Sequence, residues 1–201
     1  MARLRRTFFA RYTPTVAKAL LGCELVRVVE GERLSGRIVE TEAYRGGRDP
    51  ASHAFRGLTG RNRVMFGEAG HAYVYFTYGN HWMLNMTTER EGIPGAVLIR
   101  AIEPVEGIAT MKRRRRLSSV VGLASGPGKL TKAFAIDKEL NGEDLVRSPR
   151  LFVEGGKEPG IVGSSSRIGI SEGAELRWRF FVEGNPFVSR GRPSRPVVQN
   201  P

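Results

Sequence analysis

The sequence predicts a single α+β domain built around antiparallel strands. Apolar runs of strand length come in pairs joined by glycine-containing turns, which is the pattern of β-hairpins. The helical segments are few and short. No internal repeat and no long linker divides the 201 residues, a length that suits one well-buried core. We therefore expect one domain over residues 1–190, and a disordered, basic and proline-rich tail over residues 191–201.

The first elements are a short helix and a strand. Thr13 predicts an N-cap with Pro14 at the first helical position, and Gly22 ends the short helix. Residues 24–30 form an apolar run of strand length, and Gly31 turns the chain back. This pair of signals predicts the first hairpin.

The returning strand, Arg37 to Tyr44, carries two carboxylates and an aromatic ring on one face. Its period of two places Val39, Thr41 and Ala43 toward the core, and Ile38, Glu40, Glu42 and Tyr44 on the other face. Burying a carboxylate costs free energy unless it has hydrogen-bond partners or a functional role. The alternative is a solvated face whose glutamates form weak surface pairs with arginines.

A long loop and a second hairpin follow. The loop, residues 45–60, contains Asp49-Pro50 and His53, and loops of this length are more often functional than accidental. The strands, residues 71–77 and 82–88, flank the turn Tyr78-Gly79-Asn80. Tyr78 at the exposed tip either has a functional role or makes a capping contact with a neighbouring loop.

Basic residues mark the middle of the chain. Arg100 interrupts an apolar strand, residues 96–102, which indicates either an anionic partner or an edge strand that lets the guanidinium reach solvent. Residues 104–116 look helical and end in the run Lys112 to Arg116. Such a run is either a solvated face or a phosphate contact.

The last third begins with a glycine-rich segment, Ser125-Gly126-Pro127-Gly128-Lys129. It lacks the spacing of a nucleotide-binding P-loop, because Leu130 and not Ser or Thr follows the lysine. We read it as a helix start whose N–H groups could hold a phosphate. Further short strands are predicted at residues 151–154 and 167–170. Residues 175–183 alternate, with Leu176, Trp178, Phe180 and Val182 inward.

Composition points to a polyanionic partner. The formal net charge is +12, so nucleic acid is the first candidate and an anionic membrane surface the second. No apolar stretch approaches a membrane span and no secretory signal is visible. A single cysteine, Cys23, excludes an internal disulfide. We expect a cytoplasmic protein, associated with the nucleoid if it is bacterial.

The three histidines lack metal-ligand spacing and no Gly-x-Ser-x-Gly occurs, so we expect no metal, no cofactor and no serine nucleophile. A carboxylate base, an arginine, aromatic rings and a positive surface remain. Those parts suit metal-independent hydrolysis of a bond in a nucleic acid.

An ordered series of motifs closely resembles the alkyladenine (3-methyladenine) DNA glycosylase family over nearly the whole chain after the first dozen residues. It comprises Ile38 to Tyr44, His53, Arg61-Asn62-Arg63, Met65-Phe66, Tyr73-Val74-Tyr75, Tyr78-Gly79, Asn85, Leu98 to Pro104, Ser125 to Leu130, Ala135 to Lys138, Arg167 to Ile170 and Gly184 to Ser189. The resemblance implies a curved antiparallel sheet with surrounding helices and a protruding hairpin.

The implied activity is removal of alkylated or deaminated purines from duplex DNA. These are 3-methyladenine, 7-methylguanine, hypoxanthine and ethenoadenine, flipped out of the helix before hydrolysis of the N-glycosidic bond leaves an abasic site. Glu42 matches the general base and Arg100 the residue that orients its water. Tyr78 matches the wedge that fills the vacated space.

The remaining matches concern the base pocket and the DNA backbone. Tyr44 and Tyr75 match the aromatic walls, and His53 the contact to the purine edge. Asn85 matches the residue that crowds the amino group of guanine. Leu98 lines the floor of the same pocket, and Ile168 offers its backbone carbonyl to the water that Glu42 holds. Our candidates for phosphate contacts are Arg61, Arg63, Lys129 and Lys138.

Two departures and two alternatives accompany this interpretation. The loop between His53 and Arg61 is one residue shorter than the family pattern, so Arg56 is unmatched, and the run at Lys112 to Arg116 has no counterpart. We expect a monofunctional, monomeric enzyme. The alternatives are a non-catalytic domain that binds lesion DNA and a bifunctional glycosylase-lyase with a lysine Schiff base, although no lysine lies near the motif residues.

Overall fold

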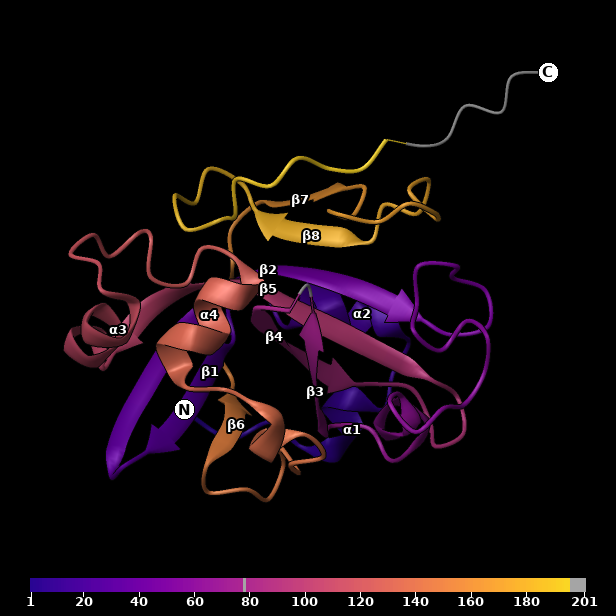
Figure 1. The fold of residues 1–201 in the computed structure, drawn as a ribbon, viewed down its shortest axis with the longest axis horizontal. Coiled ribbons are helices and arrows are strands. Elements are labelled where there is room, and N and C mark those ends of the chain that lie inside the picture. Colours follow the sequence, from indigo (N-terminus) through magenta and orange to yellow (C-terminus); the bar gives the residue numbers. More distant parts are fainter. Residues whose placement is uncertain (78, 196–201) are drawn as a thin grey trace.

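A curved antiparallel sheet forms the centre of the computed structural model, which describes residues 1–77 and 79–195 (Figure 1). The described residues form eight strands in the order β3-β4-β5-β2-β1-β6, with β8 also paired to β2 and β7 paired to β8. The strands are β1 Glu24–Val29, β2 Glu32–Arg45, β3 Ala72–Thr77, β4 His81–Thr87, β5 Gly95–Glu106, β6 Leu151–Glu154, β7 Val162–Ser165 and β8 Arg179–Val182. Both predicted hairpins, β1–β2 and β3–β4, are confirmed.

Short helices pack against this sheet. They are α1 Arg6–Phe9, α2 Thr13–Ala19, α3 Ile108–Arg115 and α4 Pro127–Phe134, with 3₁₀ turns η1 Arg63–Phe66 and η2 Lys138–Leu140. Helix α2 covers β2 and β5, while α4 covers β4 and β5 and carries α3 on its flank (Figure 1). One large apolar cluster fills the space between the layers, which confirms the predicted α+β class. Within the described ranges, no helix is both long and apolar enough to cross a membrane.

Strand β2 is the longest strand and positions the site. One edge pairs with β5, while the other edge is shared by β1 at residues 32–37 and β8 at residues 40–42. Ile38 pairs with Ile102 and Glu40 with Ala101, so Val39 bulges between them. The bulge makes the predicted alternation wrong at Ile38, which joins the main core together with Ala43.

The predicted helix over residues 104–116 begins too early. Strand β5 continues through Pro104 to Glu106, because Pro104 pairs with Gly36 on β2. A side chain at position 36 would prevent this close approach, since its Cβ would come within 2.2 Å of the Ile102 side chain. Gly107 then takes the left-handed conformation, with φ of 71°, and α3 starts after it.

The C-terminal segments are less regular than the sequence predicts. Residues 167–170 form no strand. Ile168 makes an isolated bridge with Pro193, and the N–H of Ser194 donates to the carbonyl of Arg167 at 2.8 Å. Residues 193–194 are therefore held against the site. The alternating stretch 175–183 is a strand only from Arg179, a buried residue, although Phe180 faces the core as predicted.

Candidate active site

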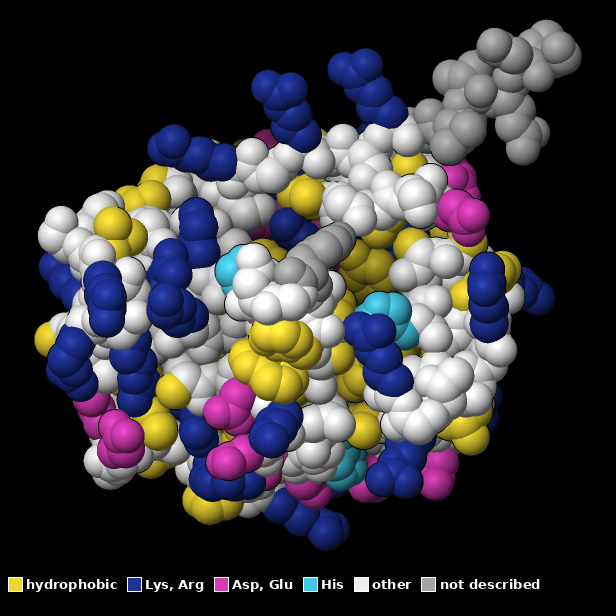
Figure 2. Space-filling view, viewed as in Figure 1, with side chains coloured by type: hydrophobic (Ala, Val, Ile, Leu, Met, Phe, Trp, Pro, Cys, Tyr) yellow, Lys and Arg dark blue, Asp and Glu magenta, His cyan; other side chains and the backbone are white. Residues whose placement is uncertain are grey.

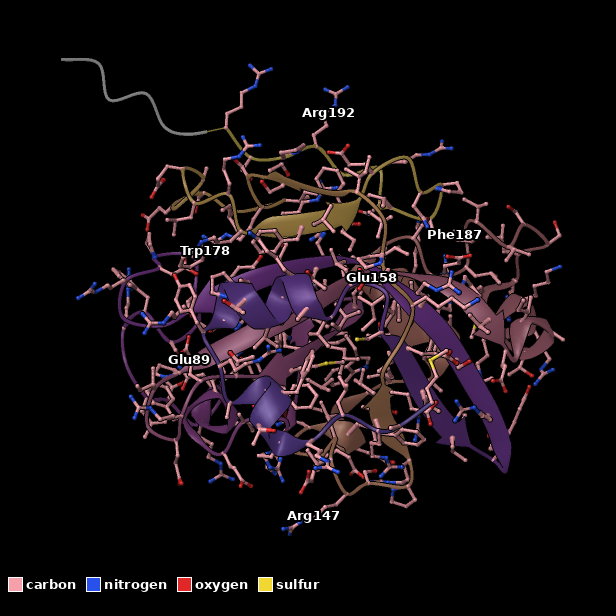
Figure 3. The ribbon with its side chains drawn as sticks, turned by 180° about the vertical axis from the view of Figure 1, so that it is seen from behind. Glu89, Arg147, Glu158, Trp178, Phe187 and Arg192 are labelled. Atoms are coloured by element: carbon pink, nitrogen blue, oxygen red, sulfur yellow. The ribbon has the colours of Figure 1, made fainter. Side chains whose placement is uncertain are left out.

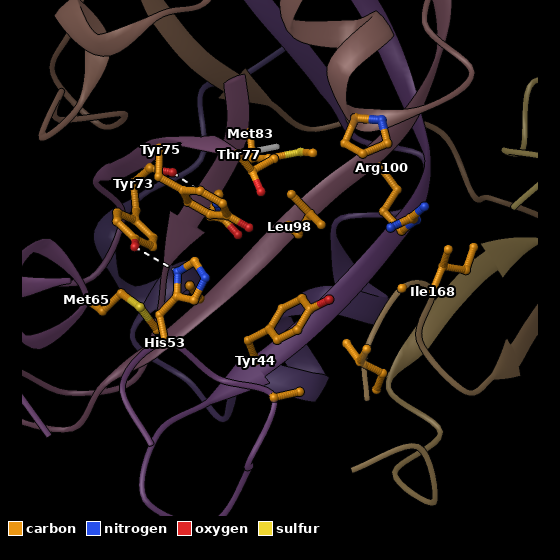
Figure 4. Close-up of a pocket in the computed structure, with 16 residues that line it drawn as sticks. Tyr44, His53, Met65, Tyr73, Tyr75, Thr77, Met83, Leu98, Arg100 and Ile168 are labelled. Carbon is orange, nitrogen blue, oxygen red and sulfur yellow. Dashed lines mark hydrogen bonds between the residues drawn. The ribbon is translucent and has the colours of Figure 1, made fainter. Parts of the chain in front are cut away.

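A cavity of about 300 Å³ opens beside the β3–β4 hairpin. Its walls come from β2, β3, β4 and β5, from the loop after β2, from the first residue of α4 and from residues 168–170. The volume lies at the lower end of small-molecule sites, which suits one flat heterocycle. Figure 4 shows Tyr44 and Arg100 toward Ile168, with His53, Tyr73 and Tyr75 together on the other side.

Three aromatic side chains form the far wall. The ring of His53 meets that of Tyr75 edge-on, with centroids 4.5 Å apart, and Nδ1 of His53 is 3.0 Å from the hydroxyl of Tyr73. Burial and the nearby Arg61 lower the pKa of His53, so its neutral form is favoured at physiological pH. The amide of Asn62, a buried residue, donates to the carbonyl of His53 at 2.8 Å and anchors the loop that carries it.

Glu42 is fully buried, and three groups from the cavity wall hold its carboxylate. The hydroxyl of Tyr44 donates to Oε2 at 2.7 Å, and Nη1 of Arg100 donates to the same oxygen at 3.2 Å. The backbone N–H of Ile168 donates to Oε1 at 2.7 Å. A carboxylate offers about four acceptor positions. Glu42 therefore has one acceptor position left, on Oε1.

Glu40 is also fully buried, and its carboxylate accepts four hydrogen bonds. Its carboxylate accepts from Nε of Arg100 at 3.1 Å, from Nε of Arg179 at 2.7 Å, and from the N–H and hydroxyl of Ser189 at 2.7 and 2.9 Å. Three of these donors reach Oε1, and the N–H of Ser189 reaches Oε2. Glu40 is therefore held by two guanidinium groups, whereas Glu42 is held by one and accepts one hydrogen bond fewer.

Two of these side chains, Tyr44 and Arg100, have raised pKa values. Burial, followed by the adjacent Glu42 carboxylate, raises the pKa of Tyr44 well above its usual value. Burial on its own would lower the pKa of Arg100, yet the carboxylates of Glu42 and Glu40 outweigh it and raise that pKa. Tyr44 therefore stays a hydrogen-bond donor and Arg100 stays a cation over the working pH range.

A second buried ion pair supports the same wall. The Arg167 guanidinium binds Asp49 in a bidentate manner, at 2.6 and 2.7 Å, and both side chains are fully buried. It also lies 4.7 Å from the ring centroid of Tyr44 and donates to the carbonyl of Ala43 at 3.0 Å. The pair fixes the Tyr44 ring from behind and places the N–H of Ile168 at Glu42.

The structure brings most of the predicted site residues together. Tyr44, His53, Tyr75, Asn85, Leu98, Arg100 and Ile168 line the cavity, and Glu42 lies directly behind it. Ile168 contacts Glu42 through its N–H, whereas the predicted contact of its carbonyl with a water molecule stays a prediction. Tyr78 lies outside the described residues. The phosphate candidates Arg61, Arg63, Lys129 and Lys138 are exposed and do not line the cavity.

Several residues that line the cavity were not predicted as site residues. They include Tyr73, Met65 and Pro127, which belong to the motifs of the resemblance, and Met83, which does not. Arg167 opens one of the quoted motifs and Arg179 lies in the alternating stretch, but neither was predicted as a site residue, because their carboxylate partners lie more than a hundred residues away. Among the residues described, no three His, Cys, Asp or Glu side chains are grouped so that they could hold a metal ion.

Comparison with known proteins gives one consistent family. The model of the methylpurine-DNA glycosylase family matches residues 7–186. A protein of Chlorobium phaeobacteroides, provisionally named 3-methyladenine DNA glycosylase, is 50% identical over 93% of this chain and 96% of its own. Proteins with the same provisional name from Carboxydothermus hydrogenoformans and Methanoculleus marisnigri are 51% and 50% identical, each over 93% of this chain and 98% of their own. The chain belongs to the methylpurine-DNA glycosylase family.

Proposed function

We propose that this protein is a monofunctional DNA glycosylase that releases alkylated or deaminated purines from duplex DNA. The observation that carries the proposal is the Glu42 carboxylate, held by three donors at the back of an aromatic cavity with one acceptor position left. A water molecule at that position would lie beside C1′ of a flipped nucleotide, on the side opposite the leaving base. Glu42 takes its proton as water attacks C1′, and the purine leaves.

The charge of the site favours this reaction. Cleavage of a glycosidic bond passes through an oxocarbenium-like state, which a nearby carboxylate stabilises. Arg100 holds the carboxylate and orients the water. A cationic purine such as 3-methyladenine or 7-methylguanine is already a good leaving group, whereas hypoxanthine or ethenoadenine needs a proton. No lysine is among the described residues that line the cavity, which argues against Schiff-base chemistry.

The cavity suits a flipped purine. Tyr44 on one side and the Tyr75 and His53 rings on the other provide faces on which a flat, electron-poor base can stack. Neutral His53 can hydrogen bond to the edge of the purine. We propose Tyr78, outside the described residues, as the wedge that fills the vacated space in the duplex.

Asn85 is proposed to exclude guanine. Its amide donates to the carbonyl of Tyr73 at 3.0 Å, so the side chain is fixed in the cavity beside Leu98, its partner across β4 and β5. Asn85→Ser is expected to increase release of unmodified guanine relative to hypoxanthine by about tenfold, because the smaller side chain makes room for the exocyclic amino group. Paired single-turnover assays on matched duplexes measure this ratio, and an unchanged ratio would remove Asn85 from the exclusion role.

The face that bears the cavity is rich in cations. Figure 2 shows lysine and arginine side chains gathered over α3 and α4 on one side of that face. Helix α3 contributes the run at Lys112 to Arg116, and Lys129 and Lys132 are exposed on α4. Because Pro127 at the start of α4 lines the cavity, a duplex with its lesion in the cavity would reach these cations. We propose that they bind phosphates.

Charge removal on α3 tests this interaction with DNA. The double variant Arg113→Gln, Arg116→Gln is expected to lower the salt slope of binding to undamaged duplex by about one to two, one for each phosphate that the variant no longer binds. Arg147→Gln, Lys157→Gln removes the same charge from exposed positions that do not line the cavity, and should leave the slope unchanged. Equal slopes for the two double variants, measured by fluorescence anisotropy, would show that α3 is only a solvated face.

The central experiment is single-turnover excision in the presence of EDTA. Duplex oligonucleotides with one hypoxanthine or one ethenoadenine, and separately methylated DNA, serve as substrates. Release of bases supports the proposed reaction, and release from methylated DNA alone would narrow the substrates to cationic purines. Tight binding to lesion DNA without any release would favour the non-catalytic alternative. Borohydride trapping on abasic DNA would indicate the bifunctional one.

A further inference from the structure

We propose that Glu40 and Arg179 are positioning residues that keep the Arg100 guanidinium hydrogen-bonded to Glu42. The inference rests on the proposed function, since it concerns how Glu42 remains charged as a base. Neither residue lines the cavity, so each acts through Arg100. Arg179 keeps Glu40 neutralised, and Arg100 is then free to hold the carboxylate that faces the substrate.

The geometry places one cation between two competing carboxylates. Arg100 donates through Nε to Glu40 at 3.1 Å and through Nη1 to Glu42 at 3.2 Å, and it is only 7% exposed. Water screens such contacts poorly in a buried position. Any negative charge on Glu40 that its other donors do not compensate therefore attracts the Arg100 guanidinium away from Glu42.

Arg179 relieves that competition from the opposite side. Its Nε lies 2.7 Å from Oε1 of Glu40, closer than Arg100, while its Nη1 donates to the hydroxyl of Ser165 at 3.0 Å. Strand β8 brings it there because Arg179 pairs with Glu42 across β2 and β8. Ser189 adds two donors to Glu40. Arg179 and Ser189 thus supply three of the four hydrogen bonds to Glu40, and Arg100 supplies only one.

The charges in the network balance. Glu40 and Glu42 oppose Arg100 and Arg179, and the nearby Arg167 is matched by Asp49. The groups that face Glu42 are Glu40 and Tyr44 on β2, Arg100 on β5, Arg179 on β8, and the N–H of Ile168 beside Arg167. Removal of one member therefore changes the net charge around Glu42, and the sign depends on which member is removed.

The test is the pH dependence of excision, and two variants should shift it in opposite directions. Arg179→Gln removes a positive charge and leaves Glu40 to recruit Arg100, so the charged form of Glu42 becomes less favourable. The acid limb of the single-turnover rate should move to higher pH by about one unit. Glu40→Gln removes a competing negative charge, so the acid limb should move to lower pH by a similar amount.

The substrate is a duplex with one 7-methylguanine, because a cationic base leaves without an acid and the acid limb then reports the water-activating group. Release without protein is subtracted at each pH. Arg179→Lys keeps the positive charge and should restore a profile close to the wild type. Arg177→Gln and Glu183→Gln change the same charges at exposed positions flanking β8, and should not move the acid limb.

The outcomes separate the possibilities. Arg179→Gln and Glu40→Gln both break buried ion pairs and should lower the melting temperature. If the two residues had only a structural role, the melting temperatures would fall while the acid limb stayed at the same pH. Shifts in the same direction, or none, would overturn the inference while leaving the glycosylase intact. An inactive wild type would instead overturn the proposed function. If Arg179→Gln does not fold, Ser189→Ala, which removes one donor to Glu40, should give a smaller shift to higher pH, and its absence would be equally decisive.

Discussion

Glu42→Gln is expected to lower single-turnover excision by about a thousandfold, the loss typical when a general base is removed. Glutamine has nearly the same shape and can still accept the hydrogen bond from Ile168, 2.7 Å away in the wild type. Its amide cannot take a proton from water and carries no charge to stabilise the oxocarbenium-like state. Binding to lesion DNA should persist, because the cavity walls and the cationic face are unchanged.

The control for this variant is Glu158→Gln, at an exposed position that Figure 3 shows on the opposite side of the molecule from the view of Figures 1 and 2. It makes the same chemical change and should excise as the wild type does. Circular dichroism and thermal melting verify that both variants are folded. Excision by folded Glu42→Gln within tenfold of the wild type would assign the base to another residue.

Asp49→Ala is expected to cause the largest loss of stability, about 3–5 kcal/mol in the free energy of unfolding. The variant leaves the Arg167 guanidinium fully buried without a counter-charge. It also removes the acceptor for the N–H groups of Arg45 and Ala51, which shape the turn after β2. For a chain of this size the melting temperature should fall by roughly 10 °C.

The matched control is Arg147→Gln, which disrupts an exposed ion pair with Asp144 at 3.8 Å. Figure 3 shows Arg147 projecting from the edge of the molecule, and exposed pairs contribute little to stability. The double variant Asp49→Leu, Arg167→Met should lose less stability than Asp49→Ala, because no uncompensated charge remains. If Asp49→Ala melts like Arg147→Gln, the buried pair is not a main support of this wall.

The sequence predicted the strands better than their details. Period-two patterns and glycine turns located both hairpins, because a half-buried strand must alternate. The pattern could not reveal the bulge at Val39, since an inserted residue leaves no mark until its partner strand is known. Pro104 likewise suggested a helix start, whereas its pairing with Gly36 extends β5.

Residues of the candidate site could be predicted where a charged side chain stands in an apolar or aromatic stretch of the sequence. Arg100 interrupts an apolar strand, and Glu42 lies two residues from an aromatic ring on the same face. Arg167 follows three serines, and Arg179 alternates with Trp178 and Phe180, which were predicted to face inward, so neither arginine was expected to be buried. Their burial depends on carboxylates that only the folded chain brings near. The roles of all these residues in the reaction stay predictions.

The late segments of the chain have a consequence for its biosynthesis. The groups that satisfy Glu40 and Glu42 include Ile168, Arg179 and Ser189, which follow them by 126 to 149 residues. Contacts of such long range form slowly, and during translation they form only after nearly all of the chain has left the ribosome. A polypeptide cut short before Arg179 would bury two carboxylates with too few partners, at a cost of several kcal/mol. Incomplete molecules should therefore unfold and be degraded by cellular proteases, so that few survive to occupy damaged DNA without repairing it.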